Sequence, residues 1–281
     1  MTLVRTMSRA ELAVVLGWAA DEGWNPGRCD AIPFHAADPT GFLIAEADDG
    51  ELAGEPVAAI SVVRYGDRFG FLGLYIVRPE YRGRGLGMTV WNAGMAYLAG
   101  RTVGLDGVVT QQDNYRKSGF ELVHRNVRFQ GPAPGVEQHG AGLVALSDVP
   151  FDRLLAYDLP LFGAPRSAFL SAWIGMPGVI GLAADGLKGY AVARPCIEGW
   201  KIGPLFADDE KTAEALFLGI CARLPSDGPV ILDVPEPNQS AMRLAERIGL
   251  TQVFETARMY AGPAPALDLN RIYGITSFEL G

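Results

Sequence analysis

The two halves of this 281-residue chain are similar to each other at a constant spacing. The segment "LGLYIV" begins at Leu72, and the similar segment "IGPLFA" begins 130 residues later, at Ile202. The segment "SGFELVHRNVRF" ends at Phe129, and "IGLTQVFETARM" ends 130 residues later, at Met259. Chance similarity among glycines and apolar residues is the alternative. A repeat of this length predicts two domains of one fold, and the chain is long enough for two ordinary cores.

A stretch without apolar periodicity separates the two similar halves. It reads "QGPAPGVEQHGAG", residues 130–142, and its glycines and prolines are typical of a linker. We therefore expect a first domain over residues 1–130, a linker over 131–141 and a second domain over 142–281.

The pattern of apolar residues predicts an α/β fold. Ser8 and Glu11 have the spacing of a capping box, which indicates a helix start rather than a signal peptide. Strands and helices alternate along the first half, which favours a mixed sheet layered with helices. We expect helices over 8–22, 30–37 and 86–98, and strands over 41–47, 57–65, 69–77, 107–110 and 121–129.

Composition excludes several classes of function. Hydrophobic residues make up 49% of the chain and charged residues 20%, as in globular proteins with a real core. The net charge of -8 argues against binding to nucleic acid, and no apolar segment is long enough to span a membrane. Three widely spaced cysteines and three scattered histidines predict no metal site and no disulfide framework. We expect a cytoplasmic protein.

The stretch "VRPEYRGRGLG", residues 77–87, predicts a site for a diphosphate. Pro79 ends the apolar strand before it, and a helical pattern begins directly after it. Free backbone N–H groups at a helix start attract anions, and Arg82 and Arg84 add positive charge. Glycines at 83, 85 and 87 permit close backbone approach. The spacing fits neither a Walker loop nor a dinucleotide fingerprint.

The spacing R-x-x-G-x-G from Arg82 to Gly87 resembles the coenzyme A pyrophosphate loop of the GNAT superfamily of N-acetyltransferases. A second segment, "NYRKSGF", residues 114–120, resembles the later N…Y-x-x-x-G-F segment of that family. Together the two segments place a GNAT-like domain at about residues 41–129. The resemblance implies that the backbone of Ile76 and Val77 binds pantetheine beside a strand that splays away. It further implies that the pyrophosphate is held by Arg82, Gly83, Arg84, Gly85, Leu86 and Gly87.

The same resemblance assigns one catalytic role and leaves another open. Tyr115 is expected to protonate the leaving thiolate, because the pKa of a phenol lies above that of a thiol yet within reach. Asn114 is expected to hydrogen-bond the cofactor arm. Some family members have a glutamate on the central strand, but the matching residue here is Phe71. No general base is therefore assigned.

The second half lacks the residues of the cofactor loop. The positions opposite Arg82, Arg84, Gly85 and Gly87 hold Thr212, Glu214, Ala215 and Phe217. Acidic residues at 208–210 suit a helix start but would repel a pyrophosphate. The position opposite Tyr115 holds Ala245. We therefore expect tandem GNAT-like domains of which only the first is catalytic.

The predicted function is an acetyl-CoA-dependent N-acetyltransferase. It would act by direct attack on the primary amine of a small molecule bound between the two halves, with acetyl-CoA as cosubstrate. A protein or peptide N-acetyltransferase is an alternative within the same class. A CoA-binding regulatory module without catalytic ability is the alternative outside it. A fragment that ends at Gln130 is expected to keep some CoA binding and to lose transfer.

Overall fold

The computed structural model describes residues 3–47, 54–135, 142–225 and 228–281. In these residues thirteen strands form one continuous mixed sheet, so the predicted fold class is confirmed. The first half of the chain contributes β1 (Val4–Thr6), β2 (Phe42–Glu46), β3 (Pro56–Tyr65), β4 (Phe69–Val77), β5 (Thr102–Val108) and β6 (Glu121–Pro132). The second half contributes β7 (Leu143–Ala145), β8 (Ile180–Ala184), β9 (Gly189–Pro195), β10 (Trp200–Ala207), β11 (Pro229–Pro235), β12 (Thr251–Ala261) and β13 (Ile272–Gly274).

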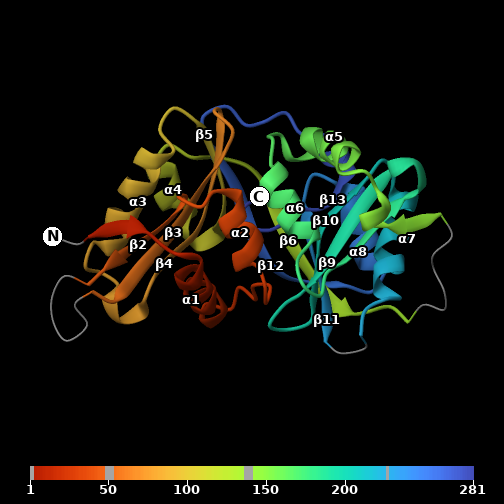
Figure 1. Ribbon diagram of the computed structural model, residues 1–281, viewed down its shortest axis with the longest axis horizontal. Helices are drawn as coiled ribbons and strands as arrows, with labels where there is room; N and C mark the ends of the chain where they lie inside the picture. The colour runs from red at the N-terminus through yellow and green to blue at the C-terminus, as the bar shows by residue number, and fades with distance from the viewer. Residues whose placement is uncertain (1–2, 48–53, 136–141, 226–227) are drawn as a thin grey trace.

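Helices cover both faces of this sheet (Figure 1). The predicted capping box is present at the first of them, where Ser8 Oγ accepts from the Glu11 backbone N–H and the Glu11 carboxylate accepts from the Ser8 N–H. The helices of the first half are α1 (Arg9–Asp21), α2 (Ala31–Ala37), α3 (Leu86–Tyr97) and α4 (Gln112–Lys117). Those of the second half are α5 (Phe151–Phe162), α6 (Ser167–Ile174), α7 (Glu210–Cys221) and α8 (Gln239–Arg247).

Each half places its last long strand in the sheet of the other half. The strand order is β1-β2-β3-β4-β5-β12-β6-β11-β10-β9-β8-β7, with β13 pairing with β10 off this path. Strand β12 of the second half therefore lies between β5 and β6, and β6 lies between β12 and β11. The exchange makes one sheet from two halves, and the exchanged strands lie near the centre of the molecule (Figure 1).

The register between the exchanged strands matches the repeat in the sequence. Asn126 on β6 pairs with Thr256 on β12, its counterpart 130 residues later. On either side, Arg125 pairs with Ala257 and residue 127 pairs with residue 255. Two equivalent positions face each other only where a local two-fold axis passes between them. The two halves are thus related by an approximate two-fold axis at Asn126 and Thr256.

Two buried ion pairs fix the exchanged strands to their hosts. On β12, Arg258 donates to both carboxylate oxygens of Asp106 on β5, at 2.8 and 2.6 Å. On β6, Arg128 makes the same double contact with Asp233 on β11, at 2.7 and 2.8 Å. All four side chains are buried. Removal of one partner from such a pair typically costs about 3–5 kcal/mol, because a buried charge is left uncompensated.

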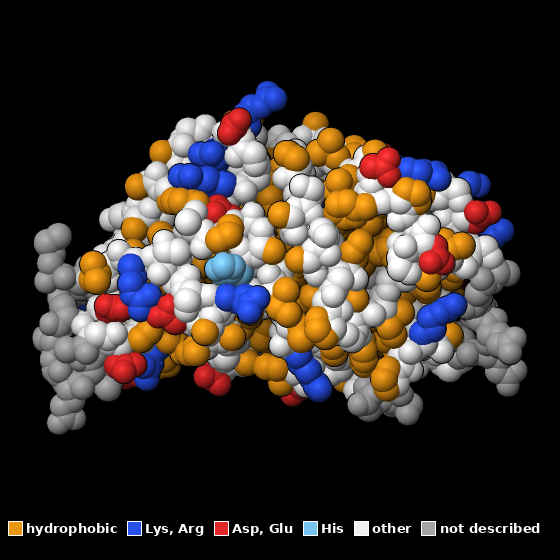
Figure 2. Space-filling view, in the orientation of Figure 1, with side chains coloured by type: hydrophobic (Ala, Val, Ile, Leu, Met, Phe, Trp, Pro, Cys, Tyr) orange, Lys and Arg blue, Asp and Glu red, His pale blue; other side chains and the backbone are white. Residues whose placement is uncertain are grey.

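The halves also share a hydrophobic core on one face of the sheet. This core packs α1 and α2 of the first half against α5 and α6 of the second. Within it the rings of Phe34 and Trp173 lie parallel, with centroids 6.4 Å apart. Smaller cores lie under α3 in the first half and under α7 and α8 in the second. On the face shown in Figure 2, Lys and Arg side chains of the described residues are interspersed with Asp and Glu.

One predicted strand differs from the structure, and part of the predicted linker lies outside the described residues. The strand expected over 107–110 was misplaced, because β5 begins at Thr102 and a 3₁₀ turn, Val109–Gln111, follows it. Strand β6 extends to Pro132, into the expected linker, and residues 136–141 of that linker lie outside the described residues. The division into domains at 131–141 stays a prediction.

Candidate active site

A wedge between β4 and β5 is the most distinctive feature of the first half. The two strands pair in parallel only from Phe69 to Leu72 on β4. Beyond Leu72, β4 continues to Val77 with β3 on its other edge, while β5 pairs with β12. Among the residues that the structure describes, no strand therefore pairs with the wedge-facing edge of β4 from residue 73 to residue 77.

A bulge in β4 lies where the wedge begins. Leu74 has a φ of 44°, which is uncommon for a residue with a side chain. The pairing with β3 shifts at this point, so that Ala59 faces Ile76 but Ser61 faces Gly73. An extra residue in one strand bends it and redirects its backbone groups. Such bulges are common beside active sites.

The wedge opens toward the start of α3, which has the features of an anion site. Gly85 is the N-cap residue with a φ of 82°, and no side chain caps the helix. The first turn of α3 therefore presents backbone N–H groups that no capping side chain satisfies, and these are the groups that bind phosphates. Gly83 also has a positive φ, 79°, so the loop turns sharply before the helix.

The two arginines of this loop have different surroundings. Arg82 donates from Nε to the Val77 carbonyl at 2.9 Å and forms an ion pair with Glu22, just after α1. Arg84 lies over the ring of Tyr81, with 5.0 Å from its Cζ to the ring centroid, and donates to the Glu80 carbonyl. Both are at the surface, where a bound anion could reach them.

A cavity of 1480 Å³ extends from the wedge toward the second half. Among the residues predicted from the sequence, Ile76, Val77, Arg82 and Tyr115 line this cavity. Asn114 does not line it, because its amide donates to Gln111 Oε1 at 2.7 Å on the exposed face of α4. Residues 83–87 lie beyond its lining, at the start of α3.

Tyr115 is both a packing residue and a cavity residue. Its ring stacks on Trp91 at a centroid distance of 5.9 Å, and a Cβ on Gly107 would lie 2.3 Å from it. Glycine at 107 thus makes room for the ring. Burial raises the pKa of Tyr115 to about 12, so the phenol stays protonated at neutral pH.

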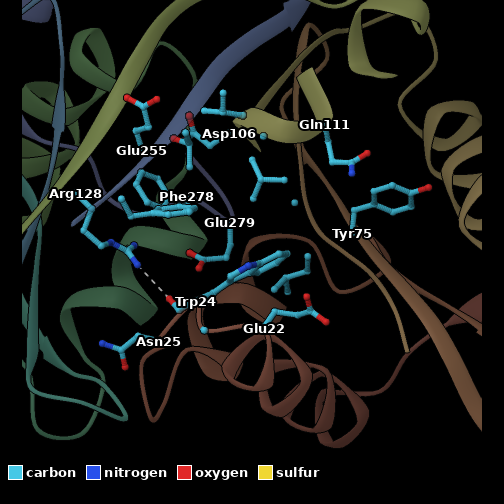
Figure 3. A pocket seen from close by; sticks show the side chains of 18 of the residues that line it. Glu22, Trp24, Asn25, Tyr75, Asp106, Gln111, Arg128, Glu255, Phe278 and Glu279 are labelled. Atoms are coloured by element: carbon cyan, nitrogen blue, oxygen red, sulfur yellow. Dashed lines mark hydrogen bonds between the residues drawn. The ribbon is translucent and has the colours of Figure 1, made fainter. Parts of the chain in front are cut away.

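Residues from both halves line the end of the cavity farthest from α3, and the sequence alone did not single them out. Arg128 is fixed there by Asp233, donates to the Trp24 carbonyl at 3.2 Å, and lies 4.6 Å from the ring centroid of Phe278 (Figure 3). Two aromatic side chains and a carboxylate lie near it. These residues are Trp24 after α1, Phe254 on β12, and Glu279 near the last described residue.

The equivalent wedge in the second half is closed by the chain itself. Strand β10 pairs in parallel with β11 only from Trp200 to Ile202, and β13 then pairs with it at Leu205 and Phe206. At the start of α7, the Asp209 carboxylate accepts from the Thr212 N–H at 2.8 Å. A strand thus fills the wedge and a carboxylate occupies the anion site.

No helix within the described parts of the chain is long and apolar enough to cross a membrane. The same residues contain no group of three or more His, Cys, Asp or Glu side chains placed to hold a metal ion.

Comparison with known proteins agrees with this geometry. A model of the acetyltransferase (GNAT) family matches residues 12–120, and a model of an acetyltransferase (GNAT) domain matches residues 154–274. The chain belongs to the GNAT family of acyltransferases. It is a tandem GNAT protein, homologous to the holothin acyltransferase of Pseudoalteromonas sp. (strain SANK 73390), with 31% identity over 277 residues, 98% of this chain and 92% of that protein.

Further relatives share part of the chain or its fold. The mycothiol acetyltransferase of Cellulomonas flavigena is 30% identical over 125 residues, 40% of this chain and 36% of that protein. A putative acetyltransferase from Pyrococcus horikoshii has the same fold, with a TM-score of 0.84 at 24% identity, over 100% of this chain and 96% of that one. A tandem GNAT protein from the clavulanic acid biosynthesis pathway has a TM-score of 0.62 at 14% identity, over 94% of this chain and 100% of that one.

Proposed function

We propose that the protein transfers an acetyl group from acetyl-CoA to the primary amine of a small molecule bound between the two halves. The observation that carries this proposal is the wedge in the first half, which joins an uncapped helix start to a cavity lined by both halves. The equivalent wedge in the second half is filled by β13. One chain therefore binds one CoA.

The proposed path of CoA follows from where these groups lie. The pyrophosphate binds at the start of α3, with Arg82 and Arg84 beside it, and pantetheine runs along the open edge of β4. The thioester then lies near Gly73, at the closed end of the wedge. Leu72, Leu105 and Glu279 line the cavity there.

The acceptor is proposed to lie against the aromatic side chains at the end of the cavity farthest from α3. Trp24, Phe254 and Phe278 offer flat apolar surface, which suits an amine carried on a compact ring system. A relative that acylates holothin supports a small-molecule acceptor over a protein. Residues from both halves line this end of the cavity.

An acceptor panel with free-thiol release from acetyl-CoA tests the proposal. The panel contains holothin, 2-phenylethylamine, tryptamine, putrescine and a lysine-containing peptide, and hexanoyl-CoA replaces acetyl-CoA in parallel. We expect turnover with the ring-bearing amines to exceed that with putrescine and the peptide. Preference for the peptide would favour the protein acetyltransferase, and CoA binding without any turnover would favour a regulatory module.

Tyr115 is proposed as the acid that protonates the CoA thiolate. A phenol with a pKa of about 12 is a weak acid, but the thiolate is expelled into a buried cavity. Burial raises the pKa of a thiol as well, which brings the pKa of donor and acceptor closer together. The proton therefore moves from Tyr115 to sulfur as the C–S bond breaks.

Tyr115→Phe is expected to lower kcat by about tenfold to a thousandfold, in the range that general acids contribute. The ring of phenylalanine keeps the contact with Trp91, so CoA affinity and thermal stability should change little. Tyr157→Phe is the matched control, since that phenol lies on α5 in the second half. Unchanged kcat in Tyr115→Phe would reduce Tyr115 to a packing residue.

A further inference from the structure

Residues 275–281 pass between the two halves and end at the wedge. A Cβ on Gly203 of β10 would lie 2.6 Å from the Ile275 carbonyl oxygen, and a Cβ on Gly73 of β4 would lie 2.1 Å from the Glu279 carbonyl oxygen. The pairing of β10 with β9 shifts in register between Ile202 and Leu205, and the segment passes this place first and then the bulge of β4. It is fixed there, because Tyr65 Oη donates to the Leu280 carbonyl at 3.0 Å. Its backbone reaches the closed end of the wedge.

The side chain of Glu279 is buried in the cavity with an uncommitted oxygen. The residue is 4% exposed and lines the cavity, and its Oε2 has no hydrogen-bond partner among the described residues. Figure 3 shows the carboxylate between Phe278 and Trp24 in this view, turned toward the side on which Arg128 lies. A buried acceptor atom without a donor is costly, so a bound water or a ligand is expected to supply the donor.

The other carboxylates of the cavity already have partners or lie at its rim. Glu22 pairs with Arg82, Asp106 pairs with Arg258, and Glu255 pairs with Arg125. Glu198 is exposed. Of the carboxylates that line the described cavity, Glu279 is thus the one that is buried and still open to an incoming ammonium group.

Three buried cations lie close enough to Glu279 to interact with its carboxylate electrostatically. They are Arg128 on β6, Arg194 on β9 and Lys201 on β10. Arg128 is paired with Asp233, and Arg194 with Asp30. Cys196, which is buried beside them, has a pKa raised by burial.

Lys201 has only a weak partner of its own. Its Nζ lies 3.5 Å from the Trp24 carbonyl oxygen, and burial lowers its pKa. The charges of the three cations and of Asp30, Asp233 and Glu279 balance. A purely structural role for Glu279, as the counter-ion of Lys201, is therefore the competing explanation that an experiment has to separate.

We propose that Glu279 is the general base that receives a proton from the acceptor amine. This inference rests on the proposed function, which brings the thioester to Gly73, and the backbone of Glu279 touches that residue. The ammonium N–H bond breaks as a carboxyl O–H bond forms. The neutral amine then attacks the acyl carbon, an N–C bond replaces the C–S bond, and the thiolate takes its proton from Tyr115. The second proton that nitrogen loses as the amide forms restores the Tyr115 phenol, and Glu279 returns its proton to solvent.

The test uses Glu279→Gln with the fastest amine of the acceptor panel. We expect kcat/KM to fall about 100-fold at pH 7, in the range of general base catalysis, with CoA affinity unchanged. The loss should shrink as the pH approaches the pKa of the amine, about 10 for an alkylamine, because the amine is then neutral without a base. Glu46→Gln, which breaks the ion pair between Glu46 on β2 and Arg5 on β1, is the matched control and should keep full activity.

A double variant separates the base from the counter-ion. Glu279→Gln leaves Lys201 without its carboxylate, so some loss of thermal stability is expected. Adding Lys201→Met should restore the melting temperature but not kcat/KM if Glu279 is the base. Recovery of both the melting temperature and kcat/KM in the double variant would overturn the proposal. A loss of activity in Glu279→Gln that is equal at every pH would overturn it as well. If the wild-type protein acylates no amine of the panel, the proposed function itself fails, and the role of Glu279 fails with it.

Discussion

Gly87→Val should abolish CoA binding. A Cβ at position 87 would lie 2.6 Å from Tyr75 Oη and 3.3 Å from Val77 Cγ2, so a branched side chain displaces the Tyr75 side chain and crowds the start of α3. The same atoms would stand between the phosphate and the N–H groups that bind it. We expect at least a 100-fold loss of affinity by calorimetry.

Gly17→Ala is the matched control for this variant. Gly17 lies in α1 with open space around a Cβ, so alanine should keep binding and slightly stabilise the helix.

Gly85→Val tests the same loop by another route. Space is open there, but the φ of 82° disfavours any residue with a Cβ, by about 1–2 kcal/mol. Full CoA affinity in both Gly87→Val and Gly85→Val would place the pyrophosphate elsewhere.

Features that depend on neighbouring residues were predictable from the sequence. The capping box at Ser8, the helix that begins after Gly85 and the Arg/Gly loop depend on residues a few positions apart. The repeat was also visible, because equivalent positions of two domains keep similar residues where they pack alike. These features identified the fold class and the GNAT family.

The misplaced strand shows where such reasoning fails. Strand β5 contains Gly104 and Gly107, which have low strand propensity. Both glycines are required by distant contacts, since a Cβ would lie 2.9 Å from Tyr260 at the first and 2.3 Å from Tyr115 at the second. The apolar "VVT" after them was taken for the strand instead. Tertiary packing outweighed local preference at this place.

The exchange of strands could not be predicted from a repeat. Strands β6 and β12 are equivalent in the repeat, so the alternation of apolar and polar residues in each suits a place in either half. From the sequence, a pairing of β6 with β5 and of β12 with β11 would be equally consistent with this pattern. The place of Glu279 in the cavity could not be predicted for a related reason. It lies far along the chain from the loop and from Tyr115, and only the path of residues 275–281 brings it to Gly73. Sequence proximity carries no information about such a contact.

A fragment that ends at Gln130 is now expected to be insoluble, in contrast to the expectation from the sequence alone. Without the second half, β5 loses β12, which pairs with its edge opposite β4. Strand β6 loses both of its neighbours, β12 and β11. Unpaired strand edges promote aggregation. The shared core would also open, exposing residues such as Phe34 and Phe71. Arg128 would lose Asp233, and Asp106 would lose Arg258.

Co-expression of the two pieces tests whether the fragment is insoluble because it lacks the strands of the second half or because it cannot fold for another reason. Residues 1–135 and 136–281, produced together, should co-purify as a one-to-one complex that binds CoA, because each piece supplies the strand that the other lacks. The matched control is residues 1–135 with a second piece truncated before β12, which should leave the first piece insoluble. A soluble, monomeric first piece with the CoA affinity of the whole chain would contradict the argument. It would mean that β6 can fold back beside β5 in the place of β12, and that the exchange follows from linking two domains rather than from a need of either one.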